Sequence, residues 1–517
     1  MERPPSNRKI FLFLFILVLL IAIAFRIYKA HHTGIIYDEA WTYGYFGNNI
    51  KAMLSPQPEP HQNYHILTSI LNCYSYKLFG GYEHFIRIPS LISGIIFSLS
   101  LAYIIYKAIS SYALRFALLA LTSLQFFVFD LSFLARGYAL GLGAIYAGIA
   151  FIIWLLENRI KYKHLWIPVA AVSLMNFIAF GSMVSTMWLL FSINVIFILL
   201  YSPNVFTNPP NRRNPVILNL ISIPLLSFLG LYMLYKNIYR GIFFASGRYT
   251  DKYCSTLFFS YTKQLLIDMF INYDSIFSVA VLGAFVLIIV ISLLFLTYKQ
   301  ISKLKSGTLH LHLARDDCGI FILLVTVVTL SAMFVHRTIL NMSIGYLRNG
   351  VFLIPMALLS VGILLDRTWS VVARKLLSRT LLISTVCIIL LLTLQNLPSP
   401  HVVKVFDWGK QSISGPLLRR LKRIDPDRVW RITLTKTMKF TYLSLQYYRQ
   451  FGYKSALSEP QNCDVLVYYK TDEPKTNAYL DGDYFSSFNC FVGIGPAFPQ
   501  TEVFPSPDLK NHPLEKK

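Results

Sequence analysis

Two adjacent carboxylates, Asp38 and Glu39, follow the first long apolar stretch of the chain in the segment "GIIYDEAWTYGYF". Two imidazoles follow in "HQNYHILTSIL", where His61 and His65 are one helical turn apart. A positioned carboxylate can accept a proton as a general base, and histidines at this spacing can bind a divalent cation. An acidic pair at a helix end is more often a solvated or capping feature, so the surroundings must decide.

Arginines form a second set of chemically capable residues. Arg87 lies in "IRIPS", Arg136 in "LARGY" and Arg348 in "YLRNG". A guanidinium group pairs bidentately with phosphate oxygens, but arginines also anchor helices in lipid headgroups. For Arg240 and Arg248, the anchoring interpretation has at least as much support as a functional one.

The elements that carry these residues are membrane helices. The chain has 517 residues, of which 55% are hydrophobic and only 14% charged, and this composition is too apolar for an ordinary soluble protein. No small-residue cleavage site follows the first apolar stretch, so we interpret it as an uncleaved span. Apolar stretches of about 20 residues predict an α-helical polytopic protein with about eleven spans, near 10–28, 85–106, 112–130, 137–156, 164–179, 182–200, 216–235, 275–297, 319–335, 348–365 and 379–396.

Charge in the connecting loops predicts the orientation. Lys and Arg gather in every second loop, which the positive-inside rule places in the cytoplasm together with the N-terminus. Residues 29–84, 131–136, 236–274, 336–347 and the tail are then extracytoplasmic. Arg136 lies on the outer side, against this bias, which favours a functional role for it. The net charge of +23 sits largely in cytoplasmic loops, so we expect contact with membrane lipids and no nucleic-acid partner.

The first outer loop and the tail both have internal structure. Phe46, Ile50, Met53 and Leu54 share one helical face and predict a short interfacial helix, and a second short helix is predicted from residue 61. Residues 398–517 alternate helical and strand patterns and predict a small soluble extracytoplasmic α/β domain after a membrane domain at 1–397. Helices are expected at 415–424 and 442–452 and strands at 428–435 and 463–470. A Cys463–Cys490 disulfide is chemically possible in an outer tail.

The order of motifs resembles the integral-membrane glycosyltransferases of the GT-C class. The matching segments are "DEAWTY", "HQNYHILTSIL", "KLFGGYEHFIRIPSLISGI", "FDLSFLARGYALGL" and "YLRNGVFLIPM". They are most similar to bacterial relatives of protein O-mannosyltransferases, glycosyltransferase family 39, and of the lipid A aminoarabinose transferase. The resemblance covers most of the membrane domain. It implies an inverting hexosyl or pentosyl transfer, in the bacterial inner membrane, from a polyprenyl-phosphate-linked donor to an extracytoplasmic protein, lipid A or other envelope glycan.

The resemblance also implies residue roles. Asp38 matches the catalytic carboxylate, Glu39 the second member of the acidic pair and Asp130 a second functional acid. A hydroxyl acceptor needs a base, whereas a lipid phosphate leaves without a strong general acid. We expect Asp38→Asn to abolish transfer and Glu39→Gln to be milder, since neighbours on an extended segment point to opposite sides. The implied substrate-binding residues are His61, His65, Arg87, Arg136, Tyr138 and Arg348.

Three questions stay open at the level of sequence. His61 and His65, with Asp38 as a third ligand, could hold a divalent cation, although roles in acceptor or phosphate binding are favoured. A lipid-linked sugar transporter or flippase is an alternative, but its polar residues would follow a path at mid-membrane and its halves would be related. A non-catalytic envelope scaffold is another alternative, and it would tolerate Asp38→Asn.

Overall fold

The computed structural model describes residues 5–46, 65–80, 82–157, 166–201, 225, 317–340, 350–371, 375–395, 397, 414–434, 455–457, 465–469 and 490–494. The predicted spans near 216–235, apart from Leu225, and 275–297 lie outside these ranges. The predicted helix at 442–452, His61, Arg348 and Cys463 also lie outside them.

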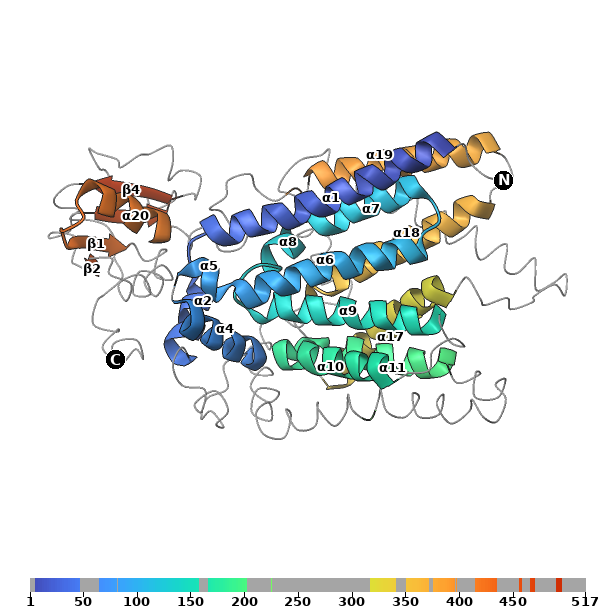
Figure 1. The fold of residues 1–517 in the computed structure, drawn as a ribbon, viewed down its shortest axis with the longest axis horizontal. Helices are drawn as coiled ribbons and strands as arrows, with labels where there is room; N and C mark the ends of the chain where they lie inside the picture. Colours follow the sequence, from blue (N-terminus) through green and yellow to red (C-terminus); the bar gives the residue numbers. More distant parts are fainter. Residues whose placement is uncertain are drawn as a thin grey trace.

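A bundle of apolar helices forms the larger part of the described chain. The helices run side by side along the long axis of the molecule (Figure 1). Three of the described helices, Arg8–His32, Ile88–Ala108 and Gly137–Glu157, are long and apolar enough to cross a membrane. The bundle comprises α1 (Pro5–His32), α6 (Ile88–Ala108), α7 (Tyr112–Leu124), α9 (Gly137–Glu157), α10 (Trp166–Ser182), α11 (Met187–Tyr201), α17 (Asp317–Leu340), α18 (Leu353–Val371) and α19 (Lys375–Gln395).

Each of these helices overlaps a span predicted from hydropathy. In five of them, the apolar part found within the described residues is shorter than a full span. These parts are Tyr112–Leu124 of α7, Ala170–Ser182 of α10, Met187–Leu199 of α11, Cys318–Met333 of α17 and Leu382–Leu394 of α19. The described residues therefore agree with a helical membrane protein, and the total of about eleven spans stays a prediction.

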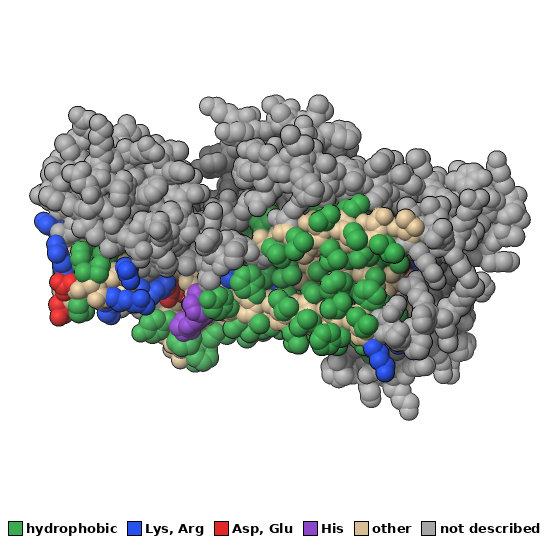
Figure 2. Space-filling model, turned by 90° about the horizontal axis from the view of Figure 1, so that it is seen from above, with side chains coloured by type: hydrophobic (Ala, Val, Ile, Leu, Met, Phe, Trp, Pro, Cys, Tyr) green, Lys and Arg blue, Asp and Glu red, His purple; other side chains and the backbone are tan. Residues whose placement is uncertain are grey.

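Helix α9 lies inside the bundle and packs against α6 and α10. Its contact with α6 depends on small residues: a Cβ atom on Gly143 would lie 2.6 Å from the carbonyl oxygen of Ser93. Missing side chains let helix backbones approach closely, as is common in membranes. Large apolar side chains on α1 and α6, among them Phe13, Leu20 and Ile92, are exposed. They form an apolar face (Figure 2) of the kind that contacts lipid.

Short helices gather at one end of the bundle. They are α2 (Tyr37–Phe46), α4 (Ile66–Phe79) and α5 (Glu83–Ile86), and they lie at the end of α1 opposite to its start (Figure 1). Helix α8 (Phe126–Leu131) leads into the connection to α9, and η1 (Val184–Thr186) joins α10 to α11. The predicted helix around Phe46–Leu54 falls mostly outside the described residues.

The expectation that Asp38 and Glu39 lie on an extended segment is wrong. Both residues are in the first turn of α2. Glu39 reaches back and accepts a hydrogen bond from the backbone N–H of Ile36 (3.1 Å), which satisfies one of the donors that a helix N-terminus leaves open. Carboxylates also favour this end of the helix dipole.

The tail contains a helix and a mixed sheet. Helix α20 (Ser414–Ile424) and strands β1 (Trp430–Leu434) and β3 (Val465–Tyr469) lie where the sequence predicts them. The sheet has the order β2-β1-β3-β4, with β2 (Ser455–Leu457) and β3 parallel to β1 and β4 (Cys490–Ile494) antiparallel to β3. Arg419 of α20 pairs with Glu83 of α5 at 2.8 Å, which joins the tail to the short-helix end of the bundle. The domain boundary at 397–398 stays a prediction.

Candidate functional site

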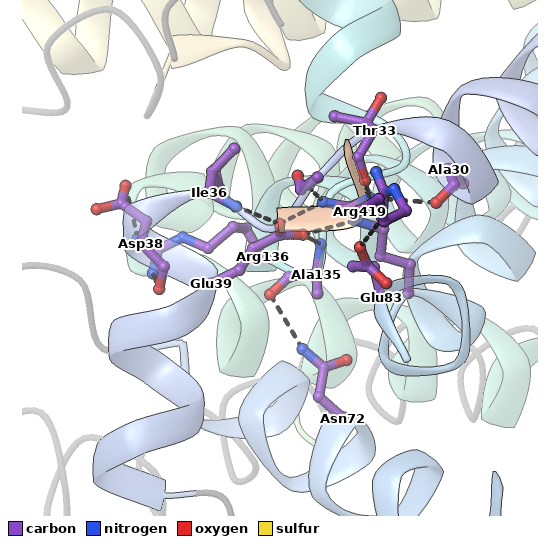
Figure 3. Close-up of polar contacts among 12 residues, drawn as sticks. Ala30, Thr33, Ile36, Asp38, Glu39, Asn72, Glu83, Ala135, Arg136 and Arg419 are labelled. Atoms are coloured by element: carbon purple, nitrogen blue, oxygen red, sulfur yellow. Dashed lines mark hydrogen bonds and ion pairs between the residues drawn. The ribbon is translucent and has the colours of Figure 1, made fainter. Parts of the chain in front are cut away.

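Glu39 and Arg87 form a buried clamp. The Nε and Nη2 groups of Arg87 donate to the two carboxylate oxygens of Glu39 at 2.9 and 2.5 Å. Glu39 also accepts from the backbone N–H of Ala135 (2.6 Å), and both side chains are fully buried. Figure 3 shows Glu39 beside Ala135 and Ile36. This clamp ties the start of α2 to α6 and to the loop before α9.

The remaining N–H groups of Arg87 donate hydrogen bonds to the end of α1. They reach the backbone carbonyls of Ala30 (3.1 Å), Thr33 (2.6 Å) and Gly34 (2.9 Å). A helix C-terminus leaves such carbonyls without intrahelical partners, and a guanidinium has five N–H donors, all of which are engaged here. Arg87 thus holds α1 to α2 in this structure, and its predicted contact with substrate stays a prediction.

Arg136 and Asp38 lie together at the other side of this network. The Nη1 group of Arg136 donates to the backbone carbonyl of Asp38 (3.2 Å) and to the hydroxyl of Thr42 (3.0 Å). Its Nη2 lies 3.5 Å from Oδ2 of Asp38, an ion pair that is longer than a hydrogen bond. Figure 3 shows Asp38 at the edge of the network, remote from Glu83 and Arg419.

Arg136 is only 1% exposed, yet its Nε and Nη2 groups have no hydrogen-bond partner among the residues that the structure describes. Asp38 is also buried, at 5% exposure. A buried guanidinium with unsatisfied donors is costly unless something else accepts from it. Arg136 therefore offers the N–H groups of Nε and Nη2 to a further acceptor, next to the Asp38 carboxylate.

The third predicted acid, Asp130, is held by a lysine. Nζ of Lys29 lies 2.7 Å from Oδ1 of Asp130, and both side chains are buried. One turn earlier on α1, Arg26 donates to the hydroxyls of Ser132 (2.6 Å) and Ser98 (2.9 Å) and to the carbonyl of Ser123 (2.9 Å). Lys29 and Arg26 thus fasten α1 to α8 and to the loop that carries Arg136.

Sequence reasoning missed both of these cations. Arg26 and Lys29 lie in the last turns of the first apolar stretch, "AFRIYKAHH", where basic residues are normally interfacial anchors. The available signal was their spacing: residues three apart in a helix share a face, and two cations on one face of a span predict a buried polar partner.

Among the described residues at this end of the bundle, buried positive charge exceeds buried negative charge. Glu83 is balanced by Arg419, which is half-buried. The fully buried ionisable side chains of the connected network are Arg26, Lys29, Arg87 and Arg136 against Asp38, Glu39 and Asp130. With the carboxylates ionised, the described residues of this network carry one positive charge in excess, which favours an anion in a low-dielectric region.

His65 and Tyr138 pack against each other beside this network. Nδ1 of His65 donates a hydrogen bond to the carbonyl of Ser182 (2.7 Å), and its ring makes an edge contact with Tyr138 at 5.1 Å between centroids. The Tyr138 ring lies 6.0 Å from the guanidinium carbon of Arg136. Tyr138 therefore lies between His65 and Arg136 at the start of α9.

Gly137 permits this packing, and its replacement gives a stability prediction. A Cβ atom on Gly137 would collide with the carbonyl oxygen of Ser182 and with Nδ1 of His65. We expect Gly137→Ala to lower the free energy of unfolding by about 1–3 kcal/mol through overpacking, measured by denaturation in detergent micelles. Gly148→Ala is the matched control on α9, because its Cβ would meet Cβ of Met175 at an ordinary 3.5 Å. Equal stability of the two variants would contradict the close contact.

A tyrosine pair borders the site on α2 and α4. The rings of Tyr43 and Tyr76 are 5.0 Å apart. Burial, followed by a hydrogen bond with Tyr76, raises the pKa of Tyr43 well above its usual value, so this phenol stays neutral.

Among the described residues, no group of three or more His, Cys, Asp and Glu is arranged to hold a metal ion. His61 and Arg348 lie outside the described residues, so a His61–His65 cation site and the role of Arg348 stay predictions.

Comparisons with known proteins found no matching family model and no matching curated sequence. Among solved structures, the chain is similar to ArnT from Cupriavidus metallidurans in the apo state, with 12% identity over 93% of this chain and 99% of that chain and a TM-score of 0.44. The same protein bound to undecaprenyl phosphate has 13% identity over 85% of this chain and 75% of that chain, with a TM-score of 0.41.

The archaeal oligosaccharyltransferase AglB from Archaeoglobus fulgidus, in complex with an inhibitory peptide and a dolichol-phosphate, is also similar. It has 10% identity over 88% of this chain and 69% of that chain, with a TM-score of 0.41. Scores below 0.5 leave the function to be inferred from the residues of this chain.

Proposed function

We propose that this chain is a membrane glycosyltransferase. It takes a sugar from a polyprenyl-phosphate carrier and passes it to an acceptor at the extracytoplasmic face, with Arg136 as the phosphate ligand and Asp38 as the general base. The observation that carries the proposal is the buried Arg136 guanidinium, whose Nε and Nη2 have no hydrogen-bond partner among the described residues, beside the Asp38 carboxylate. Each further step rests on this pair.

A lipid-linked phosphate suits Arg136 in charge and in shape. A sugar–phosphate–lipid diester carries one negative charge, which equals the excess positive charge of the buried network described above. Phosphate oxygens accept two parallel N–H bonds from a guanidinium. The apolar face of α1 and α6 extends toward this end of the bundle, so a lipid chain has an apolar surface to follow (Figure 2).

Asp38 is favoured as the base because the other two acids are engaged in shorter ion pairs. Glu39 is clamped by Arg87 and Asp130 by Lys29, at 2.5 and 2.7 Å, whereas Asp38 lies 3.5 Å from Arg136. Protonation of Glu39 or Asp130 would break a buried ion pair, which is costly. Asp38 can accept a proton at a smaller cost.

The reaction is then a single displacement. The acceptor oxygen or nitrogen attacks the anomeric carbon and gives its proton to Asp38. The bond between that carbon and the phosphate oxygen breaks, and its electron pair stays on the lipid phosphate. Arg136 stabilises the charge that grows on this oxygen. Attack opposite to the leaving group inverts the anomeric configuration.

Substitution of Arg136 tests the phosphate assignment. We expect Arg136→Ala to weaken binding of a polyprenyl phosphate to the purified protein and to lower turnover by about 10²- to 10³-fold, as removal of one charge-stabilising donor does. Arg136→Lys should recover only part of this, since lysine keeps the charge and loses the fork. Arg428→Ala, which removes an exposed arginine of the tail, is the matched control and should bind normally.

Wild-type lipid binding in Arg136→Ala would return this arginine to an anchoring role and remove the main support for the proposal. The acceptor is approached separately, by mass analysis of envelope lipids, glycans and proteins from cells with and without the chain. Under the proposal, a sugar modification is missing from the cells that lack the chain, and its structure identifies both the donor sugar and the acceptor. A transporter would instead leave the sugar attached to its carrier during movement across the membrane.

A further inference from the structure

Aromatic and imidazole side chains cluster where α1 ends against α5. The ring of His31 lies 4.9 Å from that of His32 and 4.6 Å from that of His84, between centroids. Tyr28 packs on His32 at 4.2 Å and Tyr82 stacks on His84 at 5.8 Å. Both tyrosines are about half exposed, at 47% and 57%. We call these five residues the interface cluster.

The interface cluster lies between two different surfaces. On one side is the apolar face of α1 and α6, and on the other are the Lys and Arg side chains of the tail (Figure 2). Tyrosine and histidine carry an apolar body and a polar tip, and tyrosine is enriched where a membrane meets water. The cluster therefore marks the level at which lipid headgroups begin.

Helix α20 brings a basic surface to the same level. Its leucines, Leu417, Leu418 and Leu421, are buried, whereas Arg420, Lys422 and Arg423 are exposed. The ion pair between Arg419 and Glu83 fixes α20 next to the interface cluster, because Glu83 directly precedes His84. The apolar face of α20 thus packs inside the protein, and its exposed basic face is free to attract anionic headgroups.

We propose that α20 and the interface cluster form a binding surface for the phosphate headgroups of anionic phospholipids. The basic side chains of α20 pair with the headgroup phosphates, and the cluster anchors this end of the bundle at the headgroup level. Continuity with the lipid-facing apolar surface selects a bilayer lipid as the occupant. This surface is separate from the Asp38–Arg136 pair, so the proposal does not rest on the enzymatic one.

The positive charge of this surface comes from α20. Burial lowers the pKa of His84, with His31 and Arg87 acting in the same direction and Glu83 against it. His84 is therefore neutral at pH 7. It can form a hydrogen bond with a headgroup but adds no charge to the surface. Asp425 and Asp427 follow α20 directly and limit the net charge, so the exposed residues Arg420, Lys422 and Arg423 decide the affinity.

The test measures binding of fluorescent phosphatidylglycerol to the purified full-length protein in detergent micelles. Phosphatidylglycerol should bind the wild type, and phosphatidylcholine of the same chain length should compete poorly. Arg420→Gln with Arg423→Gln should weaken binding by about 30-fold, because each basic residue near an anionic lipid surface contributes on the order of 1 kcal/mol. Arg428→Gln with Arg431→Gln removes the same charge from exposed positions beside and within β1, and should change binding less than threefold.

Wild-type affinity in the Arg420/Arg423 variant, or equal loss in both variants, would overturn the proposal. Equal competition by phosphatidylcholine would also overturn it, since the surface would then bind lipid without regard to charge. Circular dichroism of both variants establishes that the tail is folded before binding is compared. A failed transferase assay in an otherwise lipid-binding protein would bear on Asp38 and Arg136 alone.

Discussion

Asp38→Asn should lower transfer by about 10²- to 10⁴-fold, the range that a positioned general base contributes. Asparagine keeps the size of the side chain and removes its basicity. The backbone carbonyl of Asp38, which accepts from Arg136 and Thr42, is unchanged by the substitution. We therefore expect thermal unfolding and polyprenyl-phosphate binding to stay close to wild type, while the single-turnover transfer rate falls by this factor.

Glu39→Gln is the matched control for this prediction. Glutamine is also isosteric, but it removes the charge from the clamp with Arg87, so the main effect should be a lower unfolding midpoint. Transfer per folded molecule should fall less than in Asp38→Asn. A fully active Asp38→Asn protein would reject Asp38 as the base, and the reverse ranking at equal stability would transfer the role to Glu39.

Asp38 is proposed as the base and its neighbour Glu39 as a structural residue, and this difference shows what the sequence could and could not predict. Sequence placed Asp38, Glu39 and Arg136 on the same outer side, from loop charge, and the structure brings them to the same end of the bundle. It could not tell which arginine pairs with which acid, because Arg87 is 48 positions from Glu39 and Arg136 is 98 positions from Asp38. Such partners are chosen by helix packing, which local patterns do not encode.

Hydropathy predicted the positions of the bundle helices well because about 20 apolar residues are needed to cross a bilayer. The same hydropathy criterion did not reveal that the polar end of α1 is buried. Arg26 lies near the end of the predicted span at 10–28 and Lys29 at the start of the predicted outer loop, yet both are fully buried against Ser132 and Asp130. A window average cannot distinguish a cation that extends to the headgroups from one that finds an internal partner.

In the tail, strand length and residue composition decided which strands the sequence predicted. Strands β1 and β3 have five residues each and alternate or run apolar, so their patterns were visible. Strand β2 has only three residues, and β4, "CFVGI", contains a glycine that weakens the strand signal. Both are held by pairing with their neighbours, β1 and β3, which is non-local information.

Arg87→Met should lower the free energy of unfolding by about 3–5 kcal/mol, because it leaves the buried Glu39 carboxylate without its cation. Three carbonyls at the end of α1 lose their donors as well. The measurement is denaturation in detergent micelles. Lys107→Met is the control: it breaks the half-exposed pair with Glu157 at 2.6 Å and should cost less than about 1 kcal/mol.

A double-mutant cycle separates the clamp from a catalytic role for Arg87. Adding Glu39→Gln to Arg87→Met removes the orphaned charge, so the pair of substitutions should cost less than the sum of the two single ones. Stability should recover in part, because the α1 carbonyls still lack donors. If Arg87→Met were as stable as wild type and yet inactive, Arg87 would act on the substrate, and the clamp would not be what holds α1, α2 and the Arg136 loop together.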